Sequence, residues 1–246
     1  MWIRAELKSR AKGVLKGNYW LAFGVCLIFL IATGFFSFIQ SFQYNQNPNA
    51  SLTLLSSVSL VWSIFIGFPL NIGLCYFFIR GREQDFEFSH LLARFKHGYG
   101  QSIAAVFLVG LFVFLWSLLL LIPGIIKSYS YRMVPWLIAE NPDIGYSRAF
   151  AISKQTMRGE KWRVFVLDLS FIGWYLLCGV TLGLGIFFLC PYIMATQAEL
   201  YDVLKQKAVT LGYSELQDQT FSAPATDYIN DTAAPVRPTH GPEQIK

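Results

Sequence analysis

Residues 101–139 read QSIAAVFLVGLFVFLWSLLLLIPGIIKSYSYRMVPWLIA, and the way this stretch divides into helices decides the fold. An apolar run reaches Ile122-Pro123-Gly124, and Lys127 and Arg132 follow it. One interpretation ends a single membrane-crossing helix at Ile126 and leaves everything after it outside. The other places a hairpin turn at Pro123, because proline interrupts a helix, and gives two helices at 101–121 and 123–139.

The charges of the next segment separate the two interpretations. Residues 140–163 contain five basic side chains against three acidic ones. Lys and Arg concentrate in the cytoplasmic loops of membrane proteins, and the single-helix interpretation would place this segment outside. The sequence therefore favours the hairpin.

The rest of the chain also keeps charge out of long stretches. Residues 17–79, 97–126 and 164–198 together hold one charged side chain, that of Asp168. Charged residues make up 14% of the chain and hydrophobic ones 54%, whereas soluble proteins average about 25% charged. A soluble domain with so little charge could not cover its core with polar surface. The composition excludes a soluble enzyme, a secreted disulfide scaffold and a disordered chain, and it indicates a multi-pass membrane protein.

A helix needs about 20 residues to cross a hydrocarbon core, so the charge-free runs hold more than one helix each. The polar residues 43–49 divide the first run, and the segment 181–185, Thr-Leu-Gly-Leu-Gly, supplies a turn in the last. The predicted fold class is all-α: a polytopic membrane protein with six transmembrane helices as three hairpins, and amphipathic interfacial helices on the cytoplasmic side. The predicted helices are 19–42, 53–79, 101–121, 123–139, 163–180 and 185–204.

Basic residues gather in the segments 1–18, 80–97 and 140–163 and again from Lys205 onward, while the three opposite connections carry no charge. This asymmetry predicts a multi-pass protein of the cell membrane with both termini cytoplasmic. It also explains the formal net charge of +5 as a topology signal, so no nucleic-acid partner is expected. Residues 1–207 are predicted to form the transmembrane domain. Residues 208–246, rich in Thr, Ser, Pro, Asp and Asn, are predicted to form a disordered cytoplasmic tail.

A short pattern recurs at the membrane entry points. Lys16-Gly17-Asn18-Tyr19-Trp20 and Arg158-Gly159-Glu160-Lys161-Trp162 share a basic residue, a glycine and a tryptophan, and Lys96-His97-Gly98 is a fainter copy. Glycine ends helices and tryptophan sits at membrane interfaces, so Trp20 and Trp162 are predicted interfacial anchors. We hypothesise a threefold repeat of surface helix plus hairpin. The alternative is that such residues gather at any membrane entry point.

The surface helices are expected to contact the anionic headgroups of membrane lipids. The sequence does not decide whether the chain also binds a protein partner or forms a homo-oligomer.

Catalytic signatures are absent from the sequence: it has no H-E-x-x-H, no G-x-S-x-G and no P-loop. His90 and His97 share a segment with three acidic residues, yet histidine at a headgroup boundary needs no metal. The four cysteines lie in apolar runs and are expected to pack as small hydrophobic side chains. No enzymatic activity, cofactor or metal is predicted.

The ionisable residues inside the predicted helices are more informative. Arg132, Asp168 and Glu199 lie on the fourth, fifth and sixth helices, and such groups in lipid face the protein interior or a wet cavity. At 1.5 Å per residue, Arg132 and Asp168 lie about 12 and 8 Å below the inner surface, which is within reach of an ion pair. Glu199 lies at a similar depth and is expected to share the guanidinium. The cluster is either structural or part of a transport path, and Lys127 is expected to extend toward the outer surface.

Several motifs together resemble a known family. They are Arg4-Ala5-Glu6-Leu7-Lys8, Leu115-Trp116-Ser117, Ile122-Pro123-Gly124, Tyr129-Ser130-Tyr131, Ala139-Glu140-Asn141-Pro142, Leu169-Ser170-Phe171-Ile172-Gly173-Trp174 and Pro191-Tyr192. Over about residues 1–205 the chain resembles the uncharacterised bacterial integral membrane family called domain of unknown function 975, which is seen mostly in Gram-positive bacteria. The resemblance implies a place in the cytoplasmic membrane of a bacterium, and no established activity or functional residues. A fainter similarity to the membrane domain attached to some glycerophosphodiester phosphodiesterases suggests lipid or envelope physiology by analogy.

The function predicted first is that of a non-catalytic membrane protein with an envelope-related, lipid-related or partner-binding role. The alternative is a transporter of small solutes or lipids that uses Arg132, Asp168 and Glu199. A wet cavity around Arg132 would favour transport, whereas a closed charge cluster would favour the first function.

Overall fold

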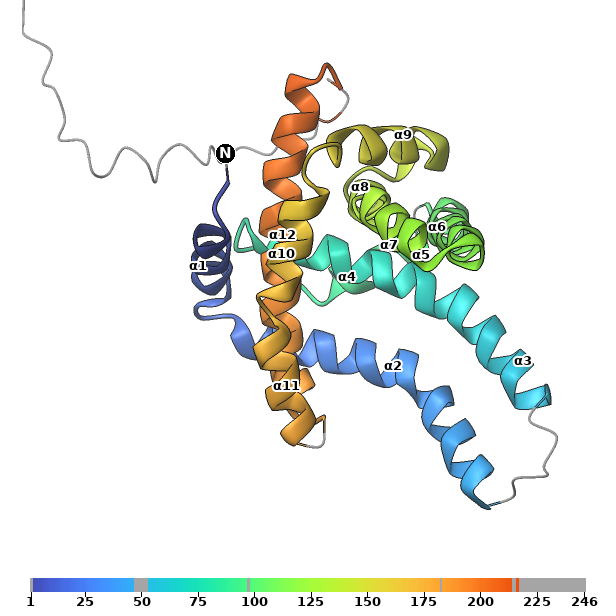
Figure 1. Cartoon of the computed structure of the whole chain (residues 1–246). Coiled ribbons are helices and arrows are strands. Elements are labelled where there is room, and N and C mark those ends of the chain that lie inside the picture. The colour runs from blue at the N-terminus through green and yellow to red at the C-terminus, as the bar shows by residue number, and fades with distance from the viewer. Residues whose placement is uncertain (1, 47–52, 97, 182, 214–215, 217–246) are drawn as a thin grey trace, which may run out of the picture.

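The computed structural model describes residues 2–46, 53–96, 98–181, 183–213 and 216. Within these residues every regular element is a helix (Figure 1). In chain order they are α1 (Arg4–Leu15), α2 (Tyr19–Gln46), α3 (Thr53–Trp62), the π-helical turn η1 (Ser63–Gly67), α4 (Phe68–Gly81), α5 (Ser89–Lys96), α6 (Tyr99–Leu119), α7 (Leu121–Ser130), α8 (Val134–Glu140), the 3-10 turn η2 (Pro142–Ile144), α9 (Tyr146–Thr156), α10 (Lys161–Leu169), α11 (Ile172–Val180) and α12 (Gly185–Thr210).

Three stretches of the described chain are long and apolar enough to cross a membrane: Ser57–Gly81, Tyr99–Leu119 and Lys161–Val180. A fourth is added if Arg4–Leu15 and Tyr19–Phe35, which meet at an angle of 99°, count as one broken span. Only 11% of the most apolar part of Tyr99–Leu119 is buried inside the protein. An apolar helix so little covered by protein needs a lipid environment, so the chain is an all-helical membrane protein.

The chain reverses at Leu120, three residues before Pro123. Leu120 is extended, with φ −161° and ψ 137°, and separates α6 from α7. Pro123 lies in the first turn of α7, where a missing N–H leaves no intrahelical hydrogen bond unmade. The two helices touch closely beyond the turn, because a Cβ on Gly124 would lie 2.1 Å from the Ser117 hydroxyl. Glycine therefore permits the close approach of α6 and α7.

A second proline shapes the other long apolar stretch. Pro69 follows the π-helical turn η1 and lies at the start of α4. Proline has no N–H to donate to the carbonyl four residues earlier, which here is that of Phe65. The Tyr99 hydroxyl donates to this carbonyl at 2.8 Å. The start of α6 is thereby tied to the irregular point between α3 and α4.

The apolar helices form arms that lead away from a common core. Figure 1 shows one arm made of α2 and α3 and another made of α11 with the first part of α12, and the two point in different directions. Large apolar side chains near the ends of the apolar helices are exposed, among them Leu118 of α6 at 78% and Val180 of α11 at 81%. Surfaces of this kind are rare on soluble proteins and indicate contact with lipid.

The core surrounds the second half of α12. Almost every residue from Ala195 to Lys205 is buried there. Helix α1 packs along α12 through Leu7, Ala11 and Leu15, which recur every four residues and so share one face.

Three glycines with left-handed conformations follow the short helices α1, α5 and α9. Gly17, Gly98 and Gly159 have φ angles of 95°, 74° and 83°, and they follow α1, α5 and α9. Only glycine adopts this conformation without steric penalty, which is why it commonly follows helix ends. The prediction that these glycines end helices is confirmed.

The predicted tail, residues 208–246, falls mostly outside the described residues. At its start α12 continues to Thr210, and Leu216 is buried.

Gly73→Ala is expected to destabilise the protein. A Cβ at this position in α4 would lie 1.9 Å from the carbonyl oxygen of Leu91 in α5. Backbone cannot rotate away as a side chain can, so α5 must move off α4, and overpacking of this kind costs about 1–3 kcal/mol.

Gly110→Ala in α6 is the matched control, since nothing lies within 4 Å of its added Cβ. Alanine there should raise stability by up to about 1 kcal/mol through helix propensity. Thermal unfolding in detergent measures both variants. Equal stability of the two would contradict the close approach of α4 and α5.

Candidate functional site

Arg132 and Asp168 form a two-pronged ion pair. Arg132 lies in the turn between α7 and α8, and Asp168 lies in α10. The two terminal guanidinium nitrogens donate to Oδ2 and Oδ1 of Asp168 at 2.6 and 2.8 Å. Paired parallel hydrogen bonds of this type are strong and fix the relative orientation of the two groups. The structure thus brings these two sequence-predicted residues together.

Two neutral side chains complete what we call the Arg132 cluster: Arg132, Asp168, Tyr129 and Gln197. The Tyr129 hydroxyl donates to Asp168 at 2.9 Å. Gln197 of α12 donates its amide N–H to Asp168 at 3.4 Å and accepts from Arg132 Nε at 3.3 Å. Each charge is therefore held by several partners, as a charge inside a membrane requires.

Glu199 lies in a different cluster. Its carboxylate accepts from Nε of Arg82 at 2.8 Å, and another nitrogen of the same guanidinium contacts Asp202 at 2.8 Å. Only 4% of the Glu199 side chain is exposed. Glu199 thus pairs with Arg82, which lies just after α4 and 117 residues away in the chain. The prediction that Glu199 shares the guanidinium of Arg132 is wrong, because Gln197 is the α12 residue that contacts that guanidinium.

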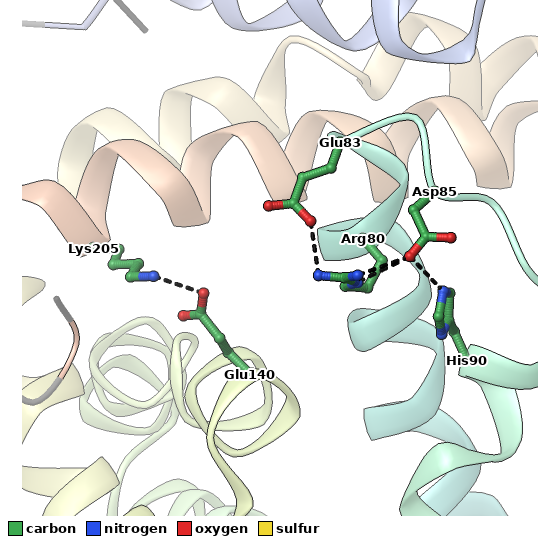
Figure 2. Close-up of polar contacts among 6 residues, drawn as sticks. All are labelled: Arg80, Glu83, Asp85, His90, Glu140 and Lys205. Atoms are coloured by element: carbon green, nitrogen blue, oxygen red, sulfur yellow. Dashed lines mark hydrogen bonds and ion pairs between the residues drawn. The ribbon is translucent and has the colours of Figure 1, made fainter. Parts of the chain in front are cut away.

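A third polar group lies nearby on α12. Lys205 donates to one oxygen of Glu140 at 2.6 Å, and the Tyr201 hydroxyl donates to the other at 2.6 Å. Figure 2 shows Lys205 reaching from α12 toward Glu140 at the end of α8. Both ion-pair side chains are under 8% exposed. Removing one partner of such a pair leaves an uncompensated buried charge and destabilises a protein by about 3–5 kcal/mol.

The sequence did not predict that Arg82, Glu140, Asp202 and Lys205 form buried ion pairs. A signal was available in α12, where Glu199, Asp202 and Lys205 recur every three residues and so lie near one side of the helix. Their partners could not be identified, because Arg82 and Glu140 lie in segments assigned to cytoplasmic connections.

His90 belongs to a polar group at the base of α4. Its Nε2 lies 3.1 Å from Asp85, which also accepts from Arg80 (Figure 2). Glu83 contacts the same guanidinium at 2.8 Å. No set of three or more metal-ligating side chains occurs among the described residues, and His97 is outside them.

The predicted interfacial tryptophans are both exposed, Trp20 at 74% and Trp162 at 72%. Lys127 lies over the ring of Trp116, with its ammonium 4.5 Å from the ring centroid. A cation over an indole face is stabilised by the charge distribution of the ring.

Glu160 joins both ends of the described chain. The Trp2 indole donates to it at 3.1 Å and Lys207 of α12 at 3.0 Å. Burial alone would raise the pKa of Glu160, but the contacts from Lys207, Trp2 and Arg163 outweigh it and hold the pKa below its ordinary value. The carboxylate therefore stays charged and ties the segment before α1 to the end of α12.

Asp168→Asn and Arg132→Gln are each expected to lower the free energy of unfolding by about 1–3 kcal/mol, because each leaves the other charge without its partner. The double swap, Arg132→Asp with Asp168→Arg, should recover much of this loss. Unfolding temperature in detergent is the measurement.

Glu6→Gln is the matched control, since it breaks the exposed Arg10–Glu6 pair in α1, which is worth under about 0.5 kcal/mol. A swapped protein no more stable than either single variant would show that the two charges do not support each other.

Nearly the whole described chain matches one known family. The family described as "Protein of unknown function (DUF975)" matches residues 1–130 and 118–208. These ranges reach from before α1 to near the end of α12. No curated protein and no solved structure matches. The resemblance drawn from the motifs is confirmed, and the chain belongs to the DUF975 family.

Proposed function

We propose that this DUF975 protein crosses the cytoplasmic membrane of a bacterium six times, as three hairpins, with both termini in the cytoplasm. The crossings beyond the three apolar stretches are assigned to α2, to α7 with α8, and to α12. The turns at Leu120 and at 181–185 carry no charge, whereas the connections at the opposite ends of the arms are basic. This distribution supports the orientation.

The charged residues of α10, of α12 and of the turn between α7 and α8 are compatible with these crossings. Arg132 and Asp168 neutralise each other, and Glu199 lies against Arg82. Polar side chains within a membrane are tolerated when they face the protein and are paired.

The role we propose is non-catalytic: the protein holds anionic lipid headgroups at its cytoplasmic face, with an envelope-related function. One observation carries this role. Helices α5 and α9 each bury apolar side chains in the core and expose basic ones, as with buried Ile152 and exposed Lys154 in α9. A helix of this kind lies in the membrane interface with Lys and Arg toward phosphates.

Transport is the second candidate, and the exposure of the Arg132 cluster favours it. The side chains of Arg132 and Asp168 are 29% and 28% exposed, so the pair is not sealed inside the protein. Against transport, neither residue lines the apolar groove of about 620 Å³ between the α1–α2 turn and the α11–α12 hairpin. The mutual contacts within the Arg132 cluster also leave it satisfied without a solute.

Cysteine labelling tests the six-crossing topology. With Cys26, Cys75, Cys178 and Cys190 replaced by alanine, a single cysteine at Leu120 or Leu184 should react with a membrane-impermeant maleimide in intact cells. Both positions are exposed, at 63% and 65%; Leu120 lies in the turn between α6 and α7, and Leu184 in the turn between α11 and α12. A cysteine at Ser147 or Arg158, both exposed, should react only after the membrane is opened. Labelling of a cysteine at position 158 in intact cells would contradict the proposed orientation.

Thermal unfolding in nanodiscs tests the lipid role. The protein should unfold at a higher temperature in phosphatidylglycerol than in phosphatidylcholine, and salt should shrink the difference as the Debye length falls from about 10 Å at 0.1 M to about 3 Å at 1 M. Replacing Arg148, Lys154 and Arg158 with Gln should lower this temperature difference, because each basic residue near the surface contributes about 1 kcal/mol to the attraction for anionic lipid.

Ser147→Ala, which changes an exposed and uncharged position on α9, should keep the full lipid difference. A protein that unfolds at the same temperature in both lipids at low salt would contradict the proposed role.

A further inference from the structure

We propose that the groove between the α1–α2 turn and the α11–α12 hairpin binds one anionic phospholipid, with its phosphate at Lys12 and Lys16 and an acyl chain along the apolar wall. The inference rests on the proposed lipid role and goes beyond it. Attraction of headgroups to basic helices is diffuse, whereas this groove defines one place and one stoichiometry.

The groove has the size and lining of a lipid-binding site. Its volume is about 620 Å³. Trp174 and Leu177 of α11 form one wall, and Phe188 and Leu189 of α12 form another. From Gly185 to Tyr192 the groove follows seven residues of helix, or about 10 Å. This length suits the part of an acyl chain nearest the headgroup.

The basic residues lie at one end of this apolar surface. Lys12 and Lys16 are both exposed and lie four residues apart, so they share a side of the α1 segment. The Lys12 ammonium lies 5.8 Å from the ring centroid of Tyr192, which also lines the groove. None of the described residues that line the groove is acidic. A ligand that fits both parts has an anionic head and an apolar body.

Backbone geometry sets the two lysines beside the apolar wall. Gly17, in the left-handed conformation at φ 95°, allows the chain to turn by 99° between α1 and α2. The Tyr19 hydroxyl donates to the carbonyl of Phe188 at 2.9 Å and fixes the start of α2 against α12. Lys8 is already engaged, because its ammonium contacts the carbonyl of Ser170 at 3.2 Å and the ring of Phe171. Lys12 and Lys16 are therefore the pair placed to receive a phosphate.

A phospholipid fits these features better than a soluble phosphate. The arm that carries the groove is exposed and apolar on its outer side, with Leu176 at 68% and Val180 at 81%. We place the exposed apolar end of this arm in the membrane, where diacyl lipids are the abundant anionic amphiphiles, and Lys12 and Lys16 at the level of their headgroups. A soluble phosphate ester would use the lysines alone and gain nothing from Leu177 or Phe188.

Native mass spectrometry of the full chain, purified in detergent and titrated with phosphatidylglycerol, tests the site. The unchanged protein should retain one phosphatidylglycerol and should bind phosphatidylcholine at least tenfold more weakly. Lys12→Gln with Lys16→Gln should weaken phosphatidylglycerol retention by about tenfold or more. Leu177→Trp should also remove it, because the indole fills the groove, whereas Leu177→Ala should keep it. Leu177 is 54% exposed, so both substitutions are compatible with folding.

The matched control is Lys154→Gln with Arg158→Gln, which removes the same charge from α9 and its end. It should retain the single lipid while losing salt-sensitive stabilisation in nanodiscs. Equal loss of lipid from both double variants would leave the general lipid role standing and remove the defined site. A lipid retained in full by the Lys12/Lys16 variant, or displaced by millimolar glycerol phosphate, would also overturn the proposal. If the unchanged protein prefers neither lipid in either assay, the general role fails too.

Discussion

Burial of charge on the second half of α12 is the constraint on which the rest of the structure depends. Glu199, Asp202 and Lys205 are each less than 10% exposed, and a buried ion without a partner is too costly to keep. Arg82 and Glu140 supply the opposite charges from the end of α4 and the end of α8. Segments more than 60 residues away in the chain must therefore meet α12, and these contacts fix where the bases of the arms lie.

The apolar arms obey the opposite rule. Their side chains are exposed, and the helices touch through small residues such as Gly124 and Gly185. At the irregular backbone before Pro69, the Tyr99 hydroxyl of α6 donates to the free carbonyl of Phe65. In lipid there is little hydrophobic gain from joining two apolar helices, so close packing and single hydrogen bonds decide their association. Core and arms thus differ in what holds them: ion pairs and burial in the first, close packing in the second.

The sequence is sufficient to predict an all-helical membrane protein, the glycine ends of the surface helices and the pairing of Arg132 with Asp168. Each depends on local features: charge-free length, a residue type that allows positive φ, or two charges at matching depth. The partner of Glu199 was not predictable in this way. Depth along a helix gives the height of a side chain and leaves its direction around the axis open, and on α12 that direction points Glu199 to Arg82 and Gln197 to Arg132.

The satisfaction of these polar groups also bears on where a ligand can act. Asp168 contacts a guanidinium, a hydroxyl and an amide, and Glu140 contacts an ammonium and a phenol, so a solute at either place would first have to displace protein contacts. The basic residues of α1 are different, because Lys12 and Lys16 stand at the rim of an apolar groove with no acid lining it among the described residues. An anion brought there adds contacts without breaking any. Electrostatics therefore favours the periphery of α1 over the centre of α12 as the place where this protein meets a ligand.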